Sequence, residues 1–310
     1  MAHWNPNGYN LITILGPTAG GKTAVATNLA YTVGGEVISG DSRQVYRGMD
    51  LGTGKDLHDY IVKGEQIPYH LIDIADAGSK FNVYEYQKHF LDAYNNITKK
   101  NVMPVLCGGS GLYIEAAIRG YRLIAVPENP ELREQLSTKS HSELEEILAS
   151  MKKLHNHTDT DTRKRLIRAI EIEEYYSKVD KKEFEYPKLK NIVFGVRFPR
   201  YQQRRRITER LKQRLNEGMI DEVKGILDKG VKPENLIYYG LEYKWITQHV
   251  LGEISYVEMF NGLNTAIHQF AKRQMTWFRR MERNGIDIHW IDGDMPMEQK
   301  LEFIFQTLRY

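Results

Sequence analysis

The residues Gly16–Thr23 read Gly-Pro-Thr-Ala-Gly-Gly-Lys-Thr and directly follow the apolar run Leu11–Leu15. This is a complete P-loop, G-x-x-x-x-G-K-[ST], in which glycines let backbone N–H groups surround phosphate oxygens. The next residues, Ala24–Ala30, favour a helix whose N-terminus would face the same anion. Strand, loop and helix in this order predict a phosphate or diphosphate site, with Lys22 as a point charge and Thr23 suited to Mg²⁺.

The overall composition is that of a globular protein. The chain has 310 residues, of which 41% are hydrophobic and 27% charged, and its net charge is +3. No apolar run approaches the roughly 20 residues of a membrane span, and the N-terminus shows no secretory signal. The single cysteine, Cys107, excludes an intrachain disulfide. We therefore expect a cytoplasmic protein without a membrane partner. We also expect it to act as a monomer.

Strand and helix patterns alternate through the first part of the chain. Strand-like runs occur at Leu11–Leu15, Glu36–Ser39 and Val102–Cys107. Alternation of this kind predicts an α/β fold, a P-loop NTPase-like parallel sheet flanked by helices. Ligands of such sheets bind beyond the carboxyl ends of the strands. The P-loop, Asp41 and the glycine loop Gly108–Gly111 all follow strands, so we expect them to meet at one edge.

The stretch 127–186 is charged and poor in strand signals, which predicts a smaller all-helical insertion. Residues 1–126 and 187–310 would then form the catalytic core. Within the insertion we expect helices at Glu131–Leu136, Ser142–Leu154 and Thr162–Tyr176. For the core we expect further strands at Asn191–Arg197 and Ile286–Ile291, and helices at Val83–Lys99, Tyr201–Leu215, Ser255–Arg280 and Met297–Leu308.

Asp41 follows the second predicted strand, at the start of the polar run Asp41–Gln44. A carboxylate at this edge could act as a general base or hold Mg²⁺ through water. An Asx-turn or a helix cap is the structural alternative. The neighbouring Ser42, Arg43 and Gln44 offer hydrogen-bonding groups to the edge of a nucleobase, although the same residues suit an ordinary polar loop.

Two basic clusters stand out in a nearly neutral chain. Arg206, Arg210 and Arg214 recur every four residues, so a helix would place them on one face. Arginine suits diphosphate and nucleic-acid phosphates, and only Glu209 offsets this cluster locally. The clusters together predict a polyanionic partner. Their members are Arg200, Arg204, Arg205, Arg206, Arg210 and Arg214 in the first, and Arg163, Lys164, Arg165 and Arg168 in the second.

Three further features carry weaker signals. Gly108–Gly111 fits either a tight strand-to-helix turn or a wall of the reaction channel. The segment Phe270–Arg280 interleaves aromatic and basic residues, which fits either stacking on nucleic acid or packing in the core. His155 and His157 lack the nearby cysteines or spaced carboxylates of a metal site, so they are poor metal candidates.

The ordered set of motifs resembles the bacterial tRNA dimethylallyltransferases. After the P-loop comes Gly40-Asp-Ser-Arg-Gln-Val-Tyr-Arg-Gly-Met-Asp-Leu-Gly-Thr-Gly-Lys55, and the likeness spans about the first 280 residues. Three departures are visible: Ser110 stands where the family usually has threonine, Gly54 where it usually has alanine, and Ile237–Lys244 fits its Gly-Tyr-Lys-Glu stretch only loosely. The later segments that fit are Tyr69–Ile74, Pro104–Tyr113, Arg163–Glu171 and Gln269–Phe278.

The resemblance implies an enzyme that moves a dimethylallyl group from dimethylallyl diphosphate to N6 of an adenosine just 3′ of the tRNA anticodon. Asp41 would take the proton from the adenine amine, and Thr18 would help to hold the reacting groups. Arg206 would stabilise the departing diphosphate. The cofactor would be Mg²⁺, with Thr23 as a ligand. The adenine would flip out of its stack to reach the site.

The resemblance also implies two sets of binding residues. The insertion and the basic clusters would grip the anticodon stem-loop, which makes tRNA binding salt-dependent. The diphosphate would lie on the P-loop residues Gly16, Pro17, Thr18, Ala19, Gly20, Gly21, Lys22 and Thr23. The tRNA would contact Asp41, Ser42, Arg43, Gln44, Ser110, Arg163, Lys164, Arg165 and Gly240.

Other functions share parts of this pattern. An isopentenyltransferase acting on free adenine nucleotides would keep the P-loop and Asp41 but would lack the helical insertion. A small-molecule kinase would bind ATP in the P-loop and use Arg163–Arg168 as a lid, with Asp41 or Asp73 near Mg²⁺. A non-catalytic RNA-binding protein would have no need for the intact Lys22, Thr23 and Asp41.

Overall fold

The computed structural model describes residues 6–152, 161–179 and 186–309. The chain forms two compact units, which are called unit 1 and unit 2 below. Unit 1 runs over Met1–Tyr121 and Pro187–Tyr310, and unit 2 over Arg122–Tyr186. The sequence therefore leaves unit 1 and returns to it after unit 2. In the described part of the chain, no helix is both long and apolar enough to cross a membrane.

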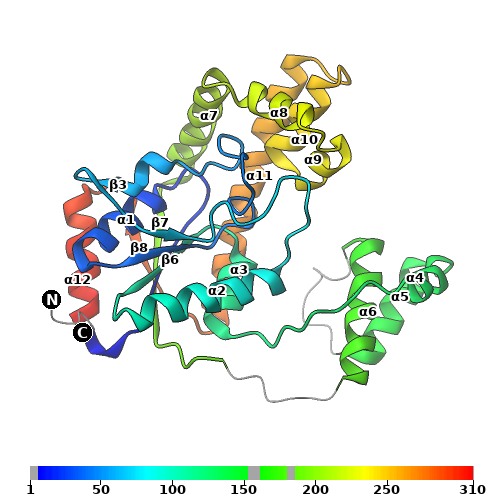
Figure 1. Ribbon diagram of the computed structural model, residues 1–310, viewed down its shortest axis with the longest axis horizontal. Helices are drawn as coiled ribbons and strands as arrows, with labels where there is room; N and C mark the ends of the chain where they lie inside the picture. Colours follow the sequence, from blue (N-terminus) through cyan, green and yellow to red (C-terminus); the bar gives the residue numbers. More distant parts are fainter. Residues whose placement is uncertain (1–5, 153–160, 180–185, 310) are drawn as a thin grey trace. The chain divides into compact units, whose positions relative to one another are not determined.

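Within the described residues of unit 1, six strands form one sheet in the order β5-β2-β6-β1-β7-β8 (Figure 1). Every neighbouring pair is parallel, which confirms the predicted parallel α/β sheet. The P-loop strand β1 lies in the interior, where Ile12 pairs with Val105 on one side and Ile192 on the other. The strands are β1 (Leu11–Leu15), β2 (Glu36–Ser39), β5 (Tyr69–His70), β6 (Pro104–Gly108), β7 (Asn191–Arg197) and β8 (Ile288–Asp292). A separate antiparallel pair consists of β3 (Ile61–Val62) and β4 (Glu65–Gln66).

Two strands begin later than the sequence predicts. The third strand was expected from Val102 and the last from Ile286, but they begin at Pro104 and Ile288. The physical reason is the same in both cases. The N–H of Val102 bonds to the Ile97 carbonyl, and the N–H of Ile286 bonds to the Met281 carbonyl. Each residue is thus used to end the preceding helix.

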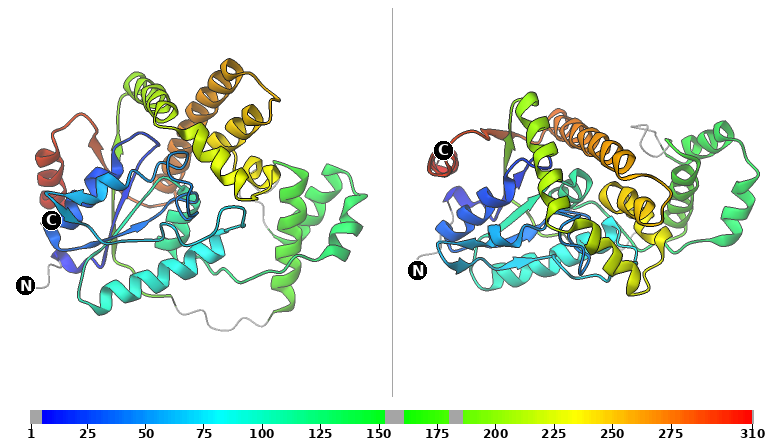
Figure 2. Two further views of the ribbon diagram at one scale, coloured as in Figure 1. Left: turned by 45° about the horizontal axis from the view of Figure 1, so that its top comes forward. Right: turned by 90° about the horizontal axis from the view of Figure 1, so that it is seen from above.

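Helices cover both faces of the sheet (Figures 1 and 2). On one face, α1 (Lys22–Val33) and α12 (Met297–Arg309) share an apolar core with Ile12 and Ile14 of β1. On the other side, α2 (Val83–Lys99) and α3 (Gly111–Arg119) contact the sheet at β2 and β6. The P-loop leads directly into α1, and the Gly108–Gly111 loop leads into α3.

A helical layer covers the loops that follow β1 and β2. Ala19 of the P-loop and Tyr46 lie in one apolar cluster with Ile207, Tyr239 and Leu263 from these helices. The sequence predicted the two long helices α7 and α11 but not the three short ones between them. The layer consists of α7 (Arg200–Asn216), α8 (Met219–Asp228), α9 (Pro233–Tyr239), α10 (Leu241–Val250) and α11 (Tyr256–Arg283) (Figure 2).

Unit 2 contains the helices α4 (Pro130–Ser137), α5 (His141–Met151) and α6 (Arg163–Lys178). The buried Glu171 joins α4 to α6. It accepts a bond from the Asn129 N–H at 2.5 Å and two bonds from Arg133, at 2.9 and 3.0 Å. Burial would raise the pKa of Glu171, but the bonds from Arg133 and Asn129 lower it overall. The predicted end of the second helix, Leu154, and the two histidines His155 and His157 lie outside the described residues.

Candidate active site

Lys22 is the first residue of α1 and lies at the carboxyl edge of the sheet, as the P-loop predicts. Burial lowers the pKa of its ammonium group, while the nearby Cys107 and Asp41 act in the opposite direction. Burial raises the pKa of Cys107 to about 12, although its hydrogen bond with Thr23 opposes the rise. Cys107 is therefore a neutral thiol under ordinary conditions, and it packs beneath the P-loop rather than acting as a nucleophile.

Two glutamines fix the backbone of Thr18. The Thr18 N–H donates to Oε1 of Gln274 at 2.9 Å, and the Thr18 carbonyl accepts from the side chain of Gln203. Gln274 also donates to the Gly109 carbonyl at 2.9 Å. One buried side chain from α11 therefore joins the P-loop to the second glycine loop. Sequence reasoning assigned no role to Gln203 or Gln274, although Gln274 lies inside a segment that resembles the family.

The loops after β2 and β6 also touch each other directly. A Cβ atom on Gly108 would overlap the Gly40 carbonyl, so only glycine permits this approach. Just beyond it, the Ser42 N–H donates to Oγ of Ser110 at 2.9 Å, and the two hydroxyls lie 3.2 Å apart. The hydroxyl of Ser110 thus holds the start of the Asp41–Gln44 run.

Asp41 makes the Asx-turn that was its structural alternative. Its Oδ1 atom accepts a hydrogen bond from the Arg43 N–H at 2.9 Å. Asp41 is also one of the charges that act on Lys22. The turn and a chemical role do not exclude each other, because the turn uses one carboxylate oxygen and holds the group beside the P-loop lysine.

The side chains expected to contact a base differ in how many of their polar groups already bind other parts of the protein. Gln44 accepts from the Ser39 hydroxyl and donates to the Gly54 carbonyl, both at 3.0 Å. The Arg43 guanidinium lies 5.3 Å from the centre of the Tyr239 ring. Gln44 is therefore committed to internal contacts, whereas the N–H groups of Arg43 can still reach a ligand. Their predicted contacts with tRNA stay predictions.

A pocket beside the P-loop combines charged and apolar walls. Thr18 of the P-loop, Arg210 and Arg214 of α7 and Glu242 of α10 form its polar part. Burial raises the pKa of Glu242, which favours its neutral form. The apolar part of the wall is formed by Ala19, Ile207, Leu211, Met219 and Ile267.

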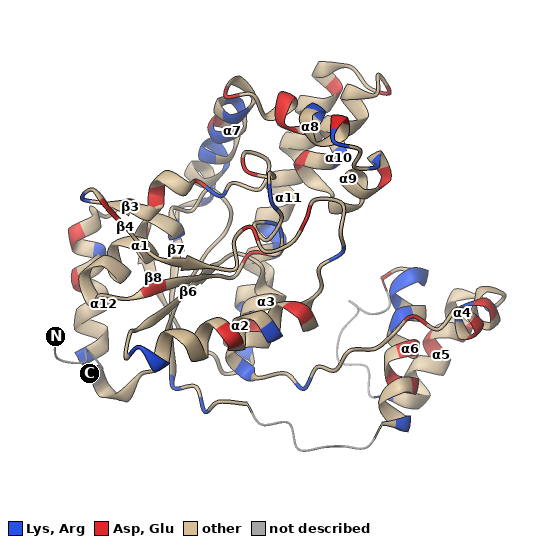
Figure 3. Ribbon diagram, viewed as in Figure 1, with Lys and Arg blue, Asp and Glu red and all other residues tan. Residues whose placement is uncertain are grey.

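Arg206 and Arg210 play different parts at the P-loop. Nε of Arg206 donates to the Ala19 carbonyl at 3.0 Å, and its guanidinium lies over the Phe198 ring at 4.2 Å. Arg210 lines the pocket, whereas Arg206 is not among its lining residues. The basic face of α7 is visible in Figure 3, but the spacing of its arginines alone did not reveal which one turns toward the pocket.

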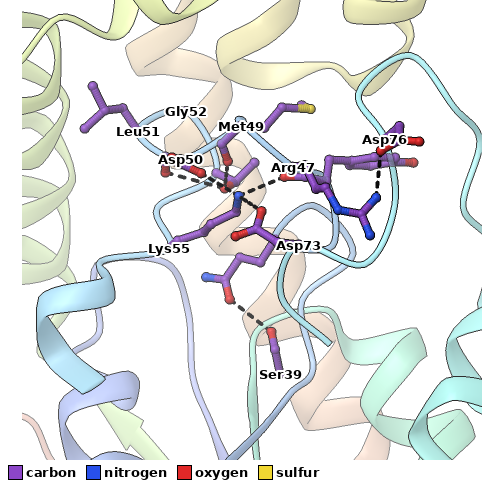
Figure 4. Close-up of polar contacts among 12 residues, drawn as sticks. Ser39, Arg47, Met49, Asp50, Leu51, Gly52, Lys55, Asp73 and Asp76 are labelled. Atoms are coloured by element: carbon purple, nitrogen blue, oxygen red, sulfur yellow. Dashed lines mark hydrogen bonds and ion pairs between the residues drawn. The ribbon is translucent and has the colours of Figure 1, made fainter. Parts of the chain in front are cut away.

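The buried side chain of Lys55 binds two acidic residues. Lys55 is 1% exposed and donates to the Tyr46 carbonyl at 2.8 Å (Figure 4). It forms ion pairs with Asp50 and Asp73. Asp73 was the second candidate magnesium ligand of the kinase alternative. Its ion pair with Lys55 supplies a structural role instead.

The basic residues of unit 2 are also partly occupied. Arg163 donates to the Leu136 and Ser137 carbonyls and so closes the end of α4. Arg165 pairs with Asp161 at 3.1 Å, and Lys164 is exposed. In unit 1, Gly240 begins α10 with φ of +75°. The predicted contacts of these residues with tRNA stay predictions.

Oxygen donors for a magnesium ion are few. The described residues contain no group of three His, Cys, Asp or Glu side chains placed to hold a metal. The Thr23 hydroxyl and the Asp41 carboxylate are hard donors of the kind that Mg²⁺ prefers. This set suits an ion bound largely by substrate oxygens and water, and it does not form a complete protein cage.

Comparison with known proteins agrees with the resemblance. The family model described as IPP transferase matches residues 44–281. The chain is 60% identical over 301 residues to a tRNA dimethylallyltransferase 2 of Bacteroides fragilis, covering 97% of this chain and 98% of the relative. It is 59% identical to a tRNA dimethylallyltransferase 2 of Phocaeicola vulgatus, again covering 97% and 98%.

Solved structures share the fold. A tRNA isopentenylpyrophosphate transferase from Bacillus halodurans has a TM-score of 0.70 and 31% identity, covering 97% of both chains. A eukaryotic dimethylallyltransferase described as acting on tRNA has a TM-score of 0.76 at 19% identity, covering 97% of this chain and 80% of that one, and so supports the fold alone. The family match, the high identity and the shared fold lead to one conclusion: this chain belongs to the IPP transferase family, together with the tRNA dimethylallyltransferases.

Proposed function

We propose that the chain transfers a dimethylallyl group from dimethylallyl diphosphate to N6 of an adenosine just 3′ of the anticodon of tRNA, releasing diphosphate. The observation that carries this proposal is the pocket beside the P-loop. Its arginines and the Thr18 backbone lie next to an apolar wall that contains Met219 and Ile267. A molecule with an anionic tail and a short branched hydrocarbon matches both parts of this wall.

Asp41 is the proposed base. It would accept the proton of the adenine amine as the nitrogen attacks the allylic carbon. Its Asx-turn to Arg43 orients the carboxylate before substrate arrives, and Ser110 supports the same loop through Ser42. The Thr18 backbone, held by two glutamines, would help to keep the reacting groups in line.

The leaving diphosphate would be stabilised by the P-loop residues Gly16–Thr23 and by arginine. Lys22 supplies a charge at the start of α1, and Arg210 supplies a second one from the pocket wall. Arg206 would act from behind, through its contact with the Ala19 carbonyl. Mg²⁺, when bound at Thr23, would add positive charge against the leaving group.

The tRNA would be gripped by Asp41, Ser42 and Arg43, by Gly240 and by the exposed basic face of α6 that includes Lys164 and Arg165. Contacts between lysine or arginine and phosphates would make this binding salt-dependent. A cytoplasmic monomer that meets tRNA directly is part of this proposal.

The function is tested by incubating the full chain with labelled dimethylallyl diphosphate, Mg²⁺ and unmodified tRNA. Parallel reactions contain AMP in place of tRNA, or ATP with small phosphate acceptors. Label in tRNA at the expected adenosine supports the proposal. Label in AMP would instead make the chain an isopentenyltransferase of free nucleotides, and ATP turnover without prenyl transfer would make it a kinase. The Asp41→Asn variant serves as the control for background transfer.

A further inference from the structure

Two arginines of α7 meet on one carboxylate. Arg210 and Arg214 lie one helical turn apart, and both form ion pairs with Asp56, the Arg214 pair at 2.8 Å. These side chains are largely withdrawn from solvent, with Arg214 10% exposed and Asp56 25% exposed. The contact spans more than 150 residues of sequence, so it ties α7 to the loop that follows β2.

Positive and negative groups alternate around this ion-pair group. Burial would raise the pKa of Asp56, but Arg210 and Arg214 lower it overall, so Asp56 is ionised. Burial lowers the pKa of Arg210, and repulsion by the Arg214 guanidinium lowers it further. Glu242 faces the same arginines from α10, and burial raises its pKa. Lys22 adds a further positive charge from the P-loop. Asp56, Asp41 and Glu242 thus lie among the three cations Arg210, Arg214 and Lys22.

The loop around Asp56 is built to fix that carboxylate. A Cβ atom on Gly54 would meet the Arg214 guanidinium, so the glycine lets the loop lie directly against the arginine in its present position. The Gly54 carbonyl accepts from Gln44 at 3.0 Å. Asp56 itself has φ of +44°, a left-handed conformation that is unfavourable for a non-glycine residue and persists only where the surroundings enforce it.

We propose that Asp56 is a positioning residue that holds Arg210 and Arg214 as a two-armed clamp for the diphosphate of the donor. The inference rests on the proposed function for the identity of the anion. Like charges four residues apart on a helix repel each other, and long side chains at a helix surface are mobile. The carboxylate removes the repulsion and takes only part of each guanidinium, which has five N–H groups. Both arginines line the pocket, together with Thr18 and Ala19.

The opposite role for Asp56 would be that of a competitor, which occupies the arginines until the diphosphate displaces it. The two roles predict opposite changes in the affinity for the anion when the charge of Asp56 is removed. Removing the charge of a positioning residue weakens binding of the anion, whereas removing the charge of a competitor strengthens it. Inorganic pyrophosphate is a probe that needs neither tRNA nor turnover.

The experiment measures pyrophosphate binding to the full chain by calorimetry for the wild type, Asp56→Asn, Arg214→Gln and the double variant. We expect each single variant to bind roughly 10-fold more weakly or worse, since each loses charge-assisted hydrogen bonds. We expect the double variant to bind no more weakly than Arg214→Gln alone, because the two residues act as one device. Asp76→Asn is the matched control, since Asp76 pairs with Arg47 at 2.6 Å on the exposed surface.

Equal or tighter binding of pyrophosphate by folded Asp56→Asn would overturn the proposal, and so would a wild-type chain that does not bind pyrophosphate. If Asp56→Asn does not fold, Arg214→Lys decides instead, because it keeps the charge and loses the fork, and unchanged binding by it would refute the clamp. Prenyl transfer by the wild type is measured separately. If the wild type transfers the prenyl group but Asp56→Asn binds pyrophosphate as well as the wild type does, the clamp alone is rejected. If Asp56→Asn binds pyrophosphate more weakly but the wild type shows no prenyl transfer, the proposed reaction alone is rejected.

Discussion

The Oε1 atom of Gln274 accepts a hydrogen bond from the backbone N–H of Thr18 at 2.9 Å, although 256 positions separate the two residues in the chain. The same side chain donates to the Gly109 carbonyl. One amide therefore sets the spacing between the loop proposed to hold the leaving group and the loop next to the proposed base. A displacement of about 1 Å in such a site can cost 100-fold in rate.

Replacing Gln274 by Leu should lower both stability and turnover. The change leaves the Thr18 N–H and the Gly109 carbonyl without their partner, and an unsatisfied buried group costs about 1–3 kcal/mol. We expect kcat for prenyl transfer to fall roughly 10- to 100-fold. Urea unfolding and steady-state kinetics measure the two effects. Gln274→Glu keeps an acceptor for the Thr18 N–H, so its stability and kcat should lie between those of the wild type and of Gln274→Leu. A leucine variant equal to the wild type in both assays would contradict the role of Gln274.

Asp41→Asn should abolish most of the transfer while leaving the loop intact. An asparagine oxygen can still accept the Arg43 N–H, so the Asx-turn survives, but the amide cannot accept a proton. Loss of a general base typically costs 10²- to 10⁴-fold in rate. Binding of tRNA should stay near the wild-type value in Asp41→Asn and should weaken in Asp41→Ala, which loses the turn as well. Substantial turnover by the asparagine variant would remove Asp41 as the base.

Affinity for pyrophosphate should fall as the solution becomes alkaline, and Lys22 should set where this happens. Burial lowers the pKa of Lys22 below its ordinary 10.5, so the free enzyme loses this positive charge at a lower pH than an exposed lysine would. Calorimetry of pyrophosphate binding across alkaline pH measures the effect. Lys22→Arg keeps its charge at every accessible pH and should bind with little loss over the same range. Identical pH profiles for the two proteins would exclude Lys22 as the titrating group.

Glu171→Gln should weaken unit 2 at neutral pH. The pKa of Glu171 is lower in the folded state than its ordinary 4.5, so its stabilising effect is present above that value and is lost as the pH falls through the folded-state pKa. We expect the free energy of opening of α6 to drop by about 2 kcal/mol at neutral pH, since the charge-assisted bonds from Arg133 and Arg168 are lost while Arg133 keeps its ion pair with Glu128. Native-state hydrogen exchange measures this opening. The gap between variant and wild type should narrow in acid, and a gap that does not change with pH would argue against an ionised Glu171.

Salt dependence should reveal whether α6 contacts RNA. If Lys164 and Arg165 each neutralise one phosphate, removing both should reduce the slope of log affinity against log salt by about 2. Filter binding or fluorescence with an anticodon stem-loop measures this slope. Lys178→Ala, at the far end of the same helix, is the matched control. Equal slopes for the double variant and the control would place the RNA elsewhere.

Local patterns in the sequence carried most of the fold. The P-loop, β1 and α1 are contiguous, and α7 and α11 are long enough for their periodicity to show. The short helices α8 to α10 and the two-residue strand β5 present too few turns or alternations to be recognised. The short helices depend on packing against Tyr46, Met49 and other residues that lie far away in the chain, and Tyr69 of β5 packs against the core under the sheet.

The sequence predicted the site residues that directly follow strands. It did not predict the contacts between residues that lie far apart in the chain. Asp41, Lys22 and Ser110 follow from the rule that ligands bind at the carboxyl edge of a parallel sheet. The pairing of Asp56 with Arg210, and the choice between Arg206 and Arg210 at the pocket, depend on how α7 is rotated against the loop after β2. That rotation is set by tertiary packing, which a spacing of four residues does not encode.

The position of β1 also has a consequence for the order in which the protein is made. β1 pairs on one side with β6 and on the other with β7, which begins 180 residues after β1 does, at Asn191. While the ribosome is still synthesising the inserted helices, the P-loop strand therefore presents an open, apolar edge to its surroundings. Nascent chains of this kind are exposed to edge-to-edge aggregation, so we expect chaperones to engage this protein before its last third emerges.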